Sequence, residues 1–144
     1  MSVFGEFYWD EHQGRRYPAG RPREERFLNL ALLVTTDIYT DHSSALEALQ
    51  LVEEARAGRD DLPEWLGDST SAYFRPSGVT ITDLGPDPQT QHYTLDEVHE
   101  TLVQYWVFLC PTAEERRASL QEWADFYAKN DPNPRHPCLD HLPL

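Results

Sequence analysis

The chain has 144 residues and a formal net charge of −13, from 25 acidic and 12 basic side chains. Aromatic residues make up 12% of the chain, which is too many for a disordered acidic protein, so the composition indicates one folded domain over residues 1–144. No stretch reaches the ~18 apolar residues of a membrane span, and the first residues lack the pattern of a secretion signal. We therefore expect a cytoplasmic protein that does not bind membranes.

The charge is unevenly distributed along the chain. Residues 1–26 hold five acids and five bases, which leaves 20 of the 25 acidic and 7 of the 12 basic side chains in residues 27–144. An acidic body repels nucleic acids and attracts basic proteins, although acidity can also serve solubility alone. The charge disfavours direct nucleic-acid binding and favours a basic protein as the partner.

The first forty residues predict two strands separated by a loop. Residues 2–9 are rich in aromatic side chains, which is typical of a strand. Residues 13–26 combine two glycines and two prolines with five arginines, and this composition predicts an Arg/Pro/Gly-rich loop at 13–26. Residues 27–39 fit a helix or a strand, and the β-branched residues near their end favour a buried strand over about 29–36.

Three helices are predicted in the rest of the chain from apolar stripes at helical spacing. In chain order they cover about 43–57, 95–109 and 113–129. The first begins at Asp41 or Ser43, and the second begins at a capping box formed by Thr94 and Glu97.

The segments between these helices predict an antiparallel sheet. An acidic loop at 59–68 presents Trp65, and a hairpin over about 71–84 turns at Pro76-Ser77-Gly78. A Pro-rich C-terminal tail follows the last helix at 130–144. We therefore expect an α+β fold in which three helices cover an antiparallel sheet with the hairpin at its centre.

No motif of a well-marked enzyme class occurs in the sequence. It has no nucleophile elbow, no phosphate-binding loop, no dinucleotide fingerprint and no zinc-protease helix. The two cysteines, Cys110 and Cys138, form no CxxC pair and are expected as reduced thiols, with Cys110 in the core. We expect no catalytic residue and no cofactor.

Two histidine-containing patterns bear on metal binding. The segment His136-Pro137-Cys138-Leu139-Asp140-His141 holds four potential ligands, and Asp96 precedes His99 by about one helical turn. The first pattern matches no closed zinc module and the second supplies half a ligand set. Each pattern alone favours a solvated polar segment, so we expect no metal site.

The N-terminal arginines could bind an anion, because a planar guanidinium holds phosphate or carboxylate through two hydrogen bonds. The candidates are Arg15, Arg16, Arg21 and Arg23. A closed pocket uniting them with Asp10, Glu11 and His12 would favour a small enzyme or a binding protein for an anionic ligand. The competing interpretation is that this loop folds onto the acidic body and relieves its self-repulsion.

Acidic residues beside tryptophans predict a surface that meets a basic protein. Aromatic anchors ringed by carboxylates are typical of binding hot spots. Trp9 and Trp65 are the expected anchors, although Trp65 fits a place in the core equally well. The expected contact residues are Trp9, Asp10, Glu11, Asp60, Asp61, Glu64, Trp65, Asp68, Asp83, Asp87, Asp96, Glu97 and Glu100.

Residues 72–109 carry a pattern of strand, turn and Val-x-Ile strand, followed by Tyr-Thr-Leu-x-Glu at the start of a helix that ends on Phe-Leu. This pattern resembles small bacterial immunity proteins, the cognate inhibitors of polymorphic and contact-dependent growth-inhibition toxins. The resemblance implies a cytoplasmic α+β protein that binds a toxin domain, often a basic nuclease or deaminase, and blocks it.

The leading hypothesis is therefore a non-enzymatic inhibitor of a basic toxin domain that acts on nucleic acid. An alternative is a phage-type protein that mimics nucleic-acid charge and inhibits a host nucleoprotein. Such a mimic needs acidic side chains in paired rows on one face.

Overall fold

The structure is a computed structural model and describes residues 2–130, 139 and 141–144. Its strands are β1 (Gly5–His12), β2 (Arg15–Pro22), β3 (Trp65–Leu66), β4 (Thr70–Arg75), β5 (Gly78–Asp83) and β6 (Thr90–Tyr93). Its helices are α1 (Leu28–Leu32), α2 (His42–Arg56), α3 (Leu95–Leu109) and α4 (Ala113–Asn130). A 3-10 turn, η1 (Glu25–Phe27), precedes α1, and a π-helical segment, η2 (Leu33–Ile38), follows it.

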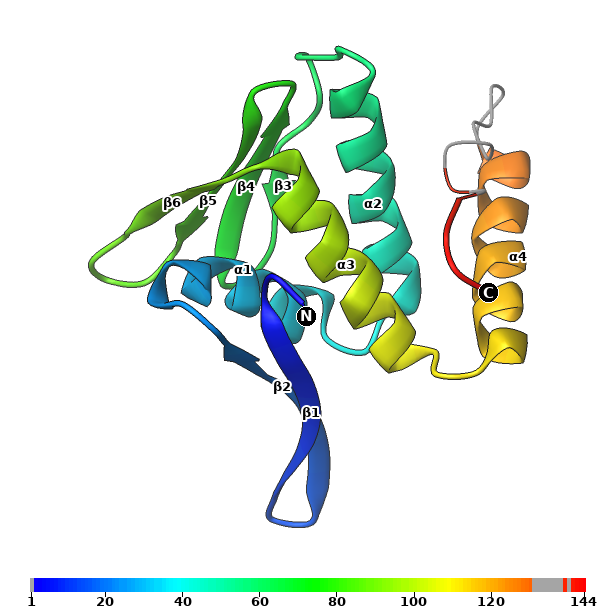
Figure 1. Ribbon diagram of the computed structural model, residues 1–144, viewed down its shortest axis with the longest axis horizontal. Coiled ribbons are helices and arrows are strands. Elements are labelled where there is room, and N and C mark those ends of the chain that lie inside the picture. The colour runs from blue at the N-terminus through cyan, green and yellow to red at the C-terminus, as the bar shows by residue number, and fades with distance from the viewer. Residues whose placement is uncertain (1, 131–138, 140) are drawn as a thin grey trace.

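The architecture is α+β, as the sequence predicts. Four antiparallel strands form a sheet in the order β3-β4-β5-β6, while β1 and β2 form a separate hairpin. Helices α1, α2 and α3 contact the sheet, and α4 contacts α2. Figure 1 shows α2 and α3 between the sheet and α4, with the β1–β2 hairpin projecting from the body. None of the helices in the described residues is long and apolar enough to cross a membrane.

The predicted helices are confirmed, and local capping explains where two of them begin. The Asp41 carboxylate caps α2 and accepts a hydrogen bond from the Ser43 backbone N–H at 3.1 Å. At the start of α3 the Glu97 N–H donates to the Thr94 hydroxyl at 3.0 Å, and the Thr94 N–H donates to the Glu97 carboxylate at 2.9 Å. These caps satisfy backbone donors that the helices leave open.

The predicted hairpin at 71–84 is confirmed as β4 and β5, with Val79 and Ile81 buried on the core face. Gly78 has a φ of +136°, and a Cβ there would lie 2.5 Å from the Tyr93 carbonyl oxygen. Glycine is thus required both by the backbone conformation and by the close approach of β6.

The prediction of a loop at 13–26 is wrong, because Arg15–Pro22 forms β2 and pairs with β1 throughout. A two-residue turn, Gln13-Gly14, with both φ angles positive, closes the hairpin. Since the closing pair of such a hairpin is hydrogen-bonded and the pairs alternate from it, Pro18 and Pro22 fall on pairs that need no N–H. The prolines therefore fit the strand without removing a ladder hydrogen bond.

The prediction of a strand over 29–36 is also wrong, because this segment is helical in α1 and η2. The buried positions Leu30, Leu33 and Val34 follow helical spacing, while Leu28 and Leu32 are exposed. The Asn29 amide anchors the helix to the sheet by donating to the carbonyls of Ile81 and Gln89, at 2.8 Å each. This tertiary anchor outweighs the strand preference of the β-branched residues.

The core lies between the sheet and helices α1, α2 and α3, and it extends to the C-terminus. Its largest fully buried side chains include Tyr105 and Trp106 of α3. Leu139 and Leu142 are buried in the same cluster, so residues near the C-terminus contribute to the core. Most of the predicted tail, residues 131–138 and 140, lies outside the described residues.

We predict that Asn29→Ala lowers the free energy of unfolding by about 2–3 kcal/mol, because two carbonyls beneath α1 lose their donors. Thr36→Ala, on an exposed position of the same helical segment, should change it by less than about 0.5 kcal/mol. Urea unfolding of both variants measures the difference. Equal effects of the two substitutions would contradict the anchoring role of Asn29.

Candidate functional site

The predicted partner-binding residues do not form one surface. Trp9, Asp10 and Glu11 lie on β1, in the projecting hairpin, whereas Asp60 and Asp61 follow α2 at the opposite end of the molecule (Figure 1). No single contact can cover both groups. Two groups this far apart share only the long-range field of the acidic body.

Most of the predicted acids have partners within the fold. The Asp96 carboxylate pairs with Arg56 at 2.8 Å, and Glu97 pairs with Arg26. The others accept hydrogen bonds or pair as follows: Asp10 with Tyr17, Asp61 with Arg59, Glu64 with Ser71, Asp83 with the N–H groups of Gly85 and Gln89, and Glu100 with the Val3 N–H. Among the described residues, the side chains of Glu11, Asp60, Asp68 and Asp87 have no such partner.

The two predicted tryptophan anchors differ in accessibility. Trp65 is half-buried, packs against the core and pairs with Ala72 through β3. Trp9 is 37% exposed, with its ring centroid 4.8 Å from that of Phe108 and the Arg16 guanidinium over its face. Of the two, Trp9 is the more exposed side chain.

The four predicted anion-binding arginines are divided as well. Arg21 pairs with Glu6, and Arg23 donates to the Ser2 carbonyl at 3.0 Å. Arg15 and Arg16 line an open hollow of about 600 Å³, together with His12, Gln13, Tyr17 and Tyr39. This hollow is not the closed pocket with Asp10 and Glu11 that the hypothesis of a small enzyme requires.

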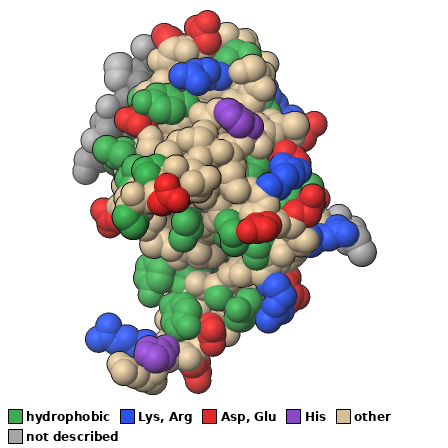
Figure 2. All heavy atoms as spheres, turned by 90° about the vertical axis from the view of Figure 1, so that its left-hand side faces the viewer, with side chains coloured by type: hydrophobic (Ala, Val, Ile, Leu, Met, Phe, Trp, Pro, Cys, Tyr) green, Lys and Arg blue, Asp and Glu red, His purple; other side chains and the backbone are tan. Residues whose placement is uncertain are grey.

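Figure 2 shows how the charges are arranged on one face of the molecule. Acidic side chains there alternate with basic and hydrophobic ones. A protein that mimics nucleic acid needs acids in paired rows, so this face does not favour the charge-mimic hypothesis.

A groove between the start of α2 and the middle of α4 brings acids and aromatic rings together. We call it the acidic groove; it encloses about 230 Å³. Its lining residues are Asp41, Ser43, Ser44 and Glu47 of the α2 end and Glu122, Trp123 and Phe126 of α4. Among its acids, Asp41 is held in place as the cap of α2.

Glu47 is the acid of the groove whose carboxylate is not paired with any other described side chain. Its side chain has neither a hydrogen bond nor an ion pair with another described residue. Partial desolvation of the carboxyl by its surroundings and, secondarily, the nearby charge of Asp41 raise the pKa of Glu47 above its ordinary value. A cation entering the groove would lower this electrostatic cost.

The groove offers the contacts that a lysine or arginine side chain makes. Carboxylates accept charge-assisted hydrogen bonds from ammonium and guanidinium groups, and an aromatic face attracts the same cations. Phe126 is 61% exposed, so its ring is accessible from solvent. The Asp41 and Glu122 side chains line the groove from the α2 end and from α4, respectively.

A Ser-His-Glu chain fixes the position of the α4 wall. The Trp106 indole N–H donates to the Ser119 hydroxyl at 3.0 Å, Ser119 lies 2.8 Å from His42 Nδ1, and His42 Nε2 lies 3.6 Å from Glu122. These are the side-chain types of a hydrolytic triad, but Ser119 is only 2% exposed and no substrate carbonyl can reach its oxygen. The chain therefore serves to tie α4 to α2.

The described thiol does not supply a nucleophile either. Cys110 is buried, as predicted, and burial raises the pKa of its thiol, so the thiolate is disfavoured near pH 7.

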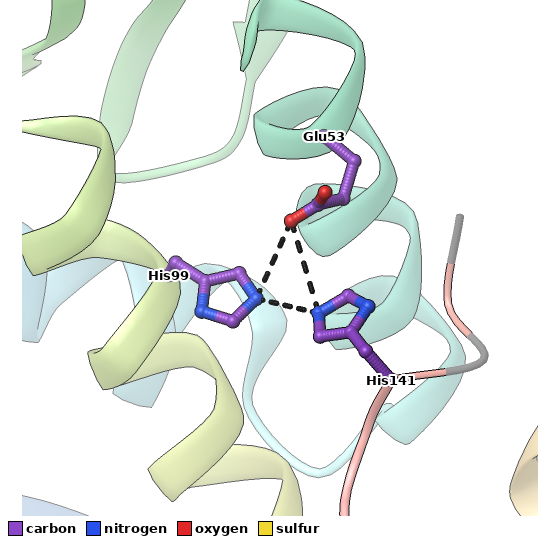
Figure 3. A group of neighbouring side chains, drawn as sticks. All are labelled: Glu53, His99 and His141. Carbon is purple, nitrogen blue, oxygen red and sulfur yellow. Dashed lines mark hydrogen bonds and ion pairs between the residues drawn. The ribbon is translucent and has the colours of Figure 1, made fainter. Parts of the chain in front are cut away.

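Side chains that could hold a metal ion gather away from the groove. Within the described residues, Glu53, His99 and His141 place their donor atoms within 4.8 Å of one another (Figure 3). The two histidines come one from each pattern noted in the sequence, whereas Glu53 has no local signal. The other candidates in the C-terminal pattern, His136, Cys138 and Asp140, lie outside the described residues.

The sequence analysis did not predict a site at the acidic groove, although one signal for it exists at Phe126. Phe126 is a large aromatic residue outside the apolar stripe of its helix, which consists of Leu120, Trp123, Ala124 and Tyr127, and an aromatic side chain on a polar face is a signal of binding. Glu47 and Glu122 have no comparable mark, because acidic residues are common on solvated helix faces.

Comparison of the chain with protein-family models, with curated proteins and with solved structures gave no match.

We predict that Glu47→Gln raises the free energy of unfolding at pH 7. Because the folded protein raises the pKa of Glu47 above 4.5, it binds the proton more tightly than the unfolded chain, and stability is lost as the pH rises through the folded pKa. The increase in the free energy of unfolding caused by Glu47→Gln should be complete at pH 7 and should disappear below pH 4.5. Urea unfolding at several pH values across this range measures it.

The matched control for this variant is Asp60→Asn, at an exposed acid without a described partner. It should change the free energy of unfolding at pH 7 by less than about 0.5 kcal/mol. A Glu47→Gln protein that is less stable than the wild type at pH 7 would contradict the electrostatic cost assigned to the groove.

Proposed function

We propose that the protein is a non-enzymatic inhibitor that captures a basic protein partner and holds one of its arginine or lysine side chains in the acidic groove. The observation that carries the proposal is the uncompensated carboxyl of Glu47 beside Asp41, Glu122 and the accessible ring of Phe126. A partly desolvated acid without a cation destabilises the free protein, and a partner that brings the cation recovers this energy on binding.

The charge of the whole chain supports the same partner. The net charge of −13 attracts a basic surface from a distance, and exposed acids far from the groove contribute to this field. Among the residues predicted from the sequence, Asp60, Asp61 and Asp87 fit this steering role better than a contact role, because they lie at exposed positions away from the groove.

The class of partner follows from the role of many basic protein surfaces, which is to bind nucleic acid. An enzyme that acts on nucleic acid carries a positive substrate surface, so an acidic protein that docks there excludes the substrate. The resemblance of residues 72–109 to immunity proteins points to a bacterial toxin domain, a nuclease or a deaminase, as the protein that is inhibited.

The proposal is tested with purified nuclease and deaminase domains of bacterial toxins, compared with acidic proteins of similar size. We expect at least one basic domain to bind and to be inhibited, with an association rate that approaches ~10⁸ M⁻¹s⁻¹ at low salt and falls as salt is added. Surface plasmon resonance at several salt concentrations measures this rate. Absence of binding across the panel, or association that does not respond to salt, would refute the proposal.

Two further variants test the role of the groove in such a complex. Glu47→Gln combined with Glu122→Gln, and separately Phe126→Ala, should each accelerate dissociation and weaken binding by about 30-fold or more, as loss of a hot spot does. The control, Asp60→Asn combined with Asp87→Asn, removes the same charge elsewhere and should chiefly slow association. If the control weakened binding as much as the groove variants, the groove would not be the contact site.

A further inference from the structure

Glu53, His99 and His141 form a triangle that joins three segments distant in sequence. Glu53 lies on α2, His99 lies on α3, and His141 lies in the C-terminal segment (Figure 3). The three donor atoms are Glu53 Oε1, His99 Nε2 and His141 Nε2. All three point toward one another, and the two imidazole rings stack with centroids 5.1 Å apart.

The spacing of these atoms matches the edges of a zinc coordination shell. The distances are 2.9 Å between the two Nε2 atoms, 3.4 Å from His99 Nε2 to Glu53 Oε1 and 3.8 Å from His141 Nε2 to the same oxygen. Ligands at about 2.0–2.1 Å from a tetrahedral zinc ion lie roughly 3.3–3.4 Å from one another. A zinc ion bound above the plane of these three atoms requires the shortest and the longest of the three distances to change by about 0.5 Å, which side-chain rotation can supply.

Hydrogen bonding alone leaves the triangle poorly satisfied. A neutral imidazole carries one N–H, so if a single Nε2 is protonated it can donate to the other Nε2 or to Glu53 Oε1, and the two atoms left without a proton face each other as lone pairs. If both Nε2 atoms carry a proton, the two protons oppose each other across 2.9 Å. A divalent cation satisfies all three lone pairs at once.

One basic side chain of the described residues lies beside the triangle. Arg56 lies near Glu53, at 3.8 Å, but it also pairs with Asp96 at 2.8 Å, so part of its charge is already compensated. The Oε1 atom of Glu53 thus faces both histidines and the Arg56 Nε.

We infer that Glu53, His99 and His141 form a zinc site that fastens the C-terminal segment to helices α2 and α3. Nitrogen and carboxylate donors suit Zn²⁺ and disfavour Mg²⁺ and Ca²⁺, which take oxygen ligands. Leu139 and Leu142, on either side of His141, are buried in the core and position the segment.

The test is titration of the full chain with Zn²⁺ after removal of metals by a chelator, followed by competition with a chromophoric zinc indicator. We expect one ion per chain, and Co²⁺ in its place should give the visible absorption of a tetrahedral site. His141→Ala should weaken zinc binding by at least about 100-fold, since even loss of a partner behind a ligand costs about 10- to 100-fold. The His141 side chain is 44% exposed, so we expect this variant to fold.

The controls are His92→Ala and His12→Ala, at exposed histidines on β6 and at the hairpin tip. Both should bind zinc as the wild type does, and Mg²⁺ should not compete. Zinc should also slow digestion of the C-terminus by a serine carboxypeptidase in the wild type and in both controls, but not in His141→Ala. Absence of saturable zinc binding, or binding that His141→Ala leaves unchanged, would overturn the inference.

Discussion

The packing of α2 against α3 is the contact on which both sites depend. Fully buried leucines on each helix, Leu46 and Leu49 on α2 and Leu102 on α3, hold the pair together. Because the helices are fixed, α2 presents its first turns to α4 and its last turns to the C-terminal segment. One helix thus supplies an acid to the groove, Glu47, and an acid to the histidine pair, Glu53. A change in this packing would alter both sites together.

The acidic side chains fall into two classes that composition alone does not distinguish. Some neutralise an arginine or cap a backbone turn, as Asp96 and Asp83 do, and these stabilise the fold. Others, such as Glu47, remain without a compensating cation among the described residues. The second class matters more for recognition, because a charge already paired inside the protein has less to gain from a partner. The net charge accounts for attraction at a distance, whereas the unpaired acids indicate where contact with a cationic side chain is favourable.

Local signals were sufficient for much of the fold, and tertiary contacts explain the remainder. The caps at Asp41 and Thr94 and the glycine turn at Gly78 act within a few residues, so helices and the central hairpin could be predicted. The helical state of residues 28–38 depends on the Asn29 anchor to a strand 52 positions away. The two sites are harder still to predict, because His99 and His141 are 42 positions apart, and the contact that ties the two walls of the groove together joins Ser119 and His42 across 77 positions. Each histidine of the zinc triangle belongs to a pattern of its own in the sequence, but only the fold brings the two together.

The prolines of β2 have a consequence for the behaviour of the chain in concentrated solution. A two-stranded hairpin has an open side on each strand, and an open strand can recruit a strand from another molecule. Pro18, which is buried, and Pro22 direct their nitrogen atoms away from β1, to the outer side of β2, where neither can donate a hydrogen bond. Edge-to-edge aggregation through β2 is thus disfavoured. The hairpin can therefore project from the body without promoting self-association through this strand.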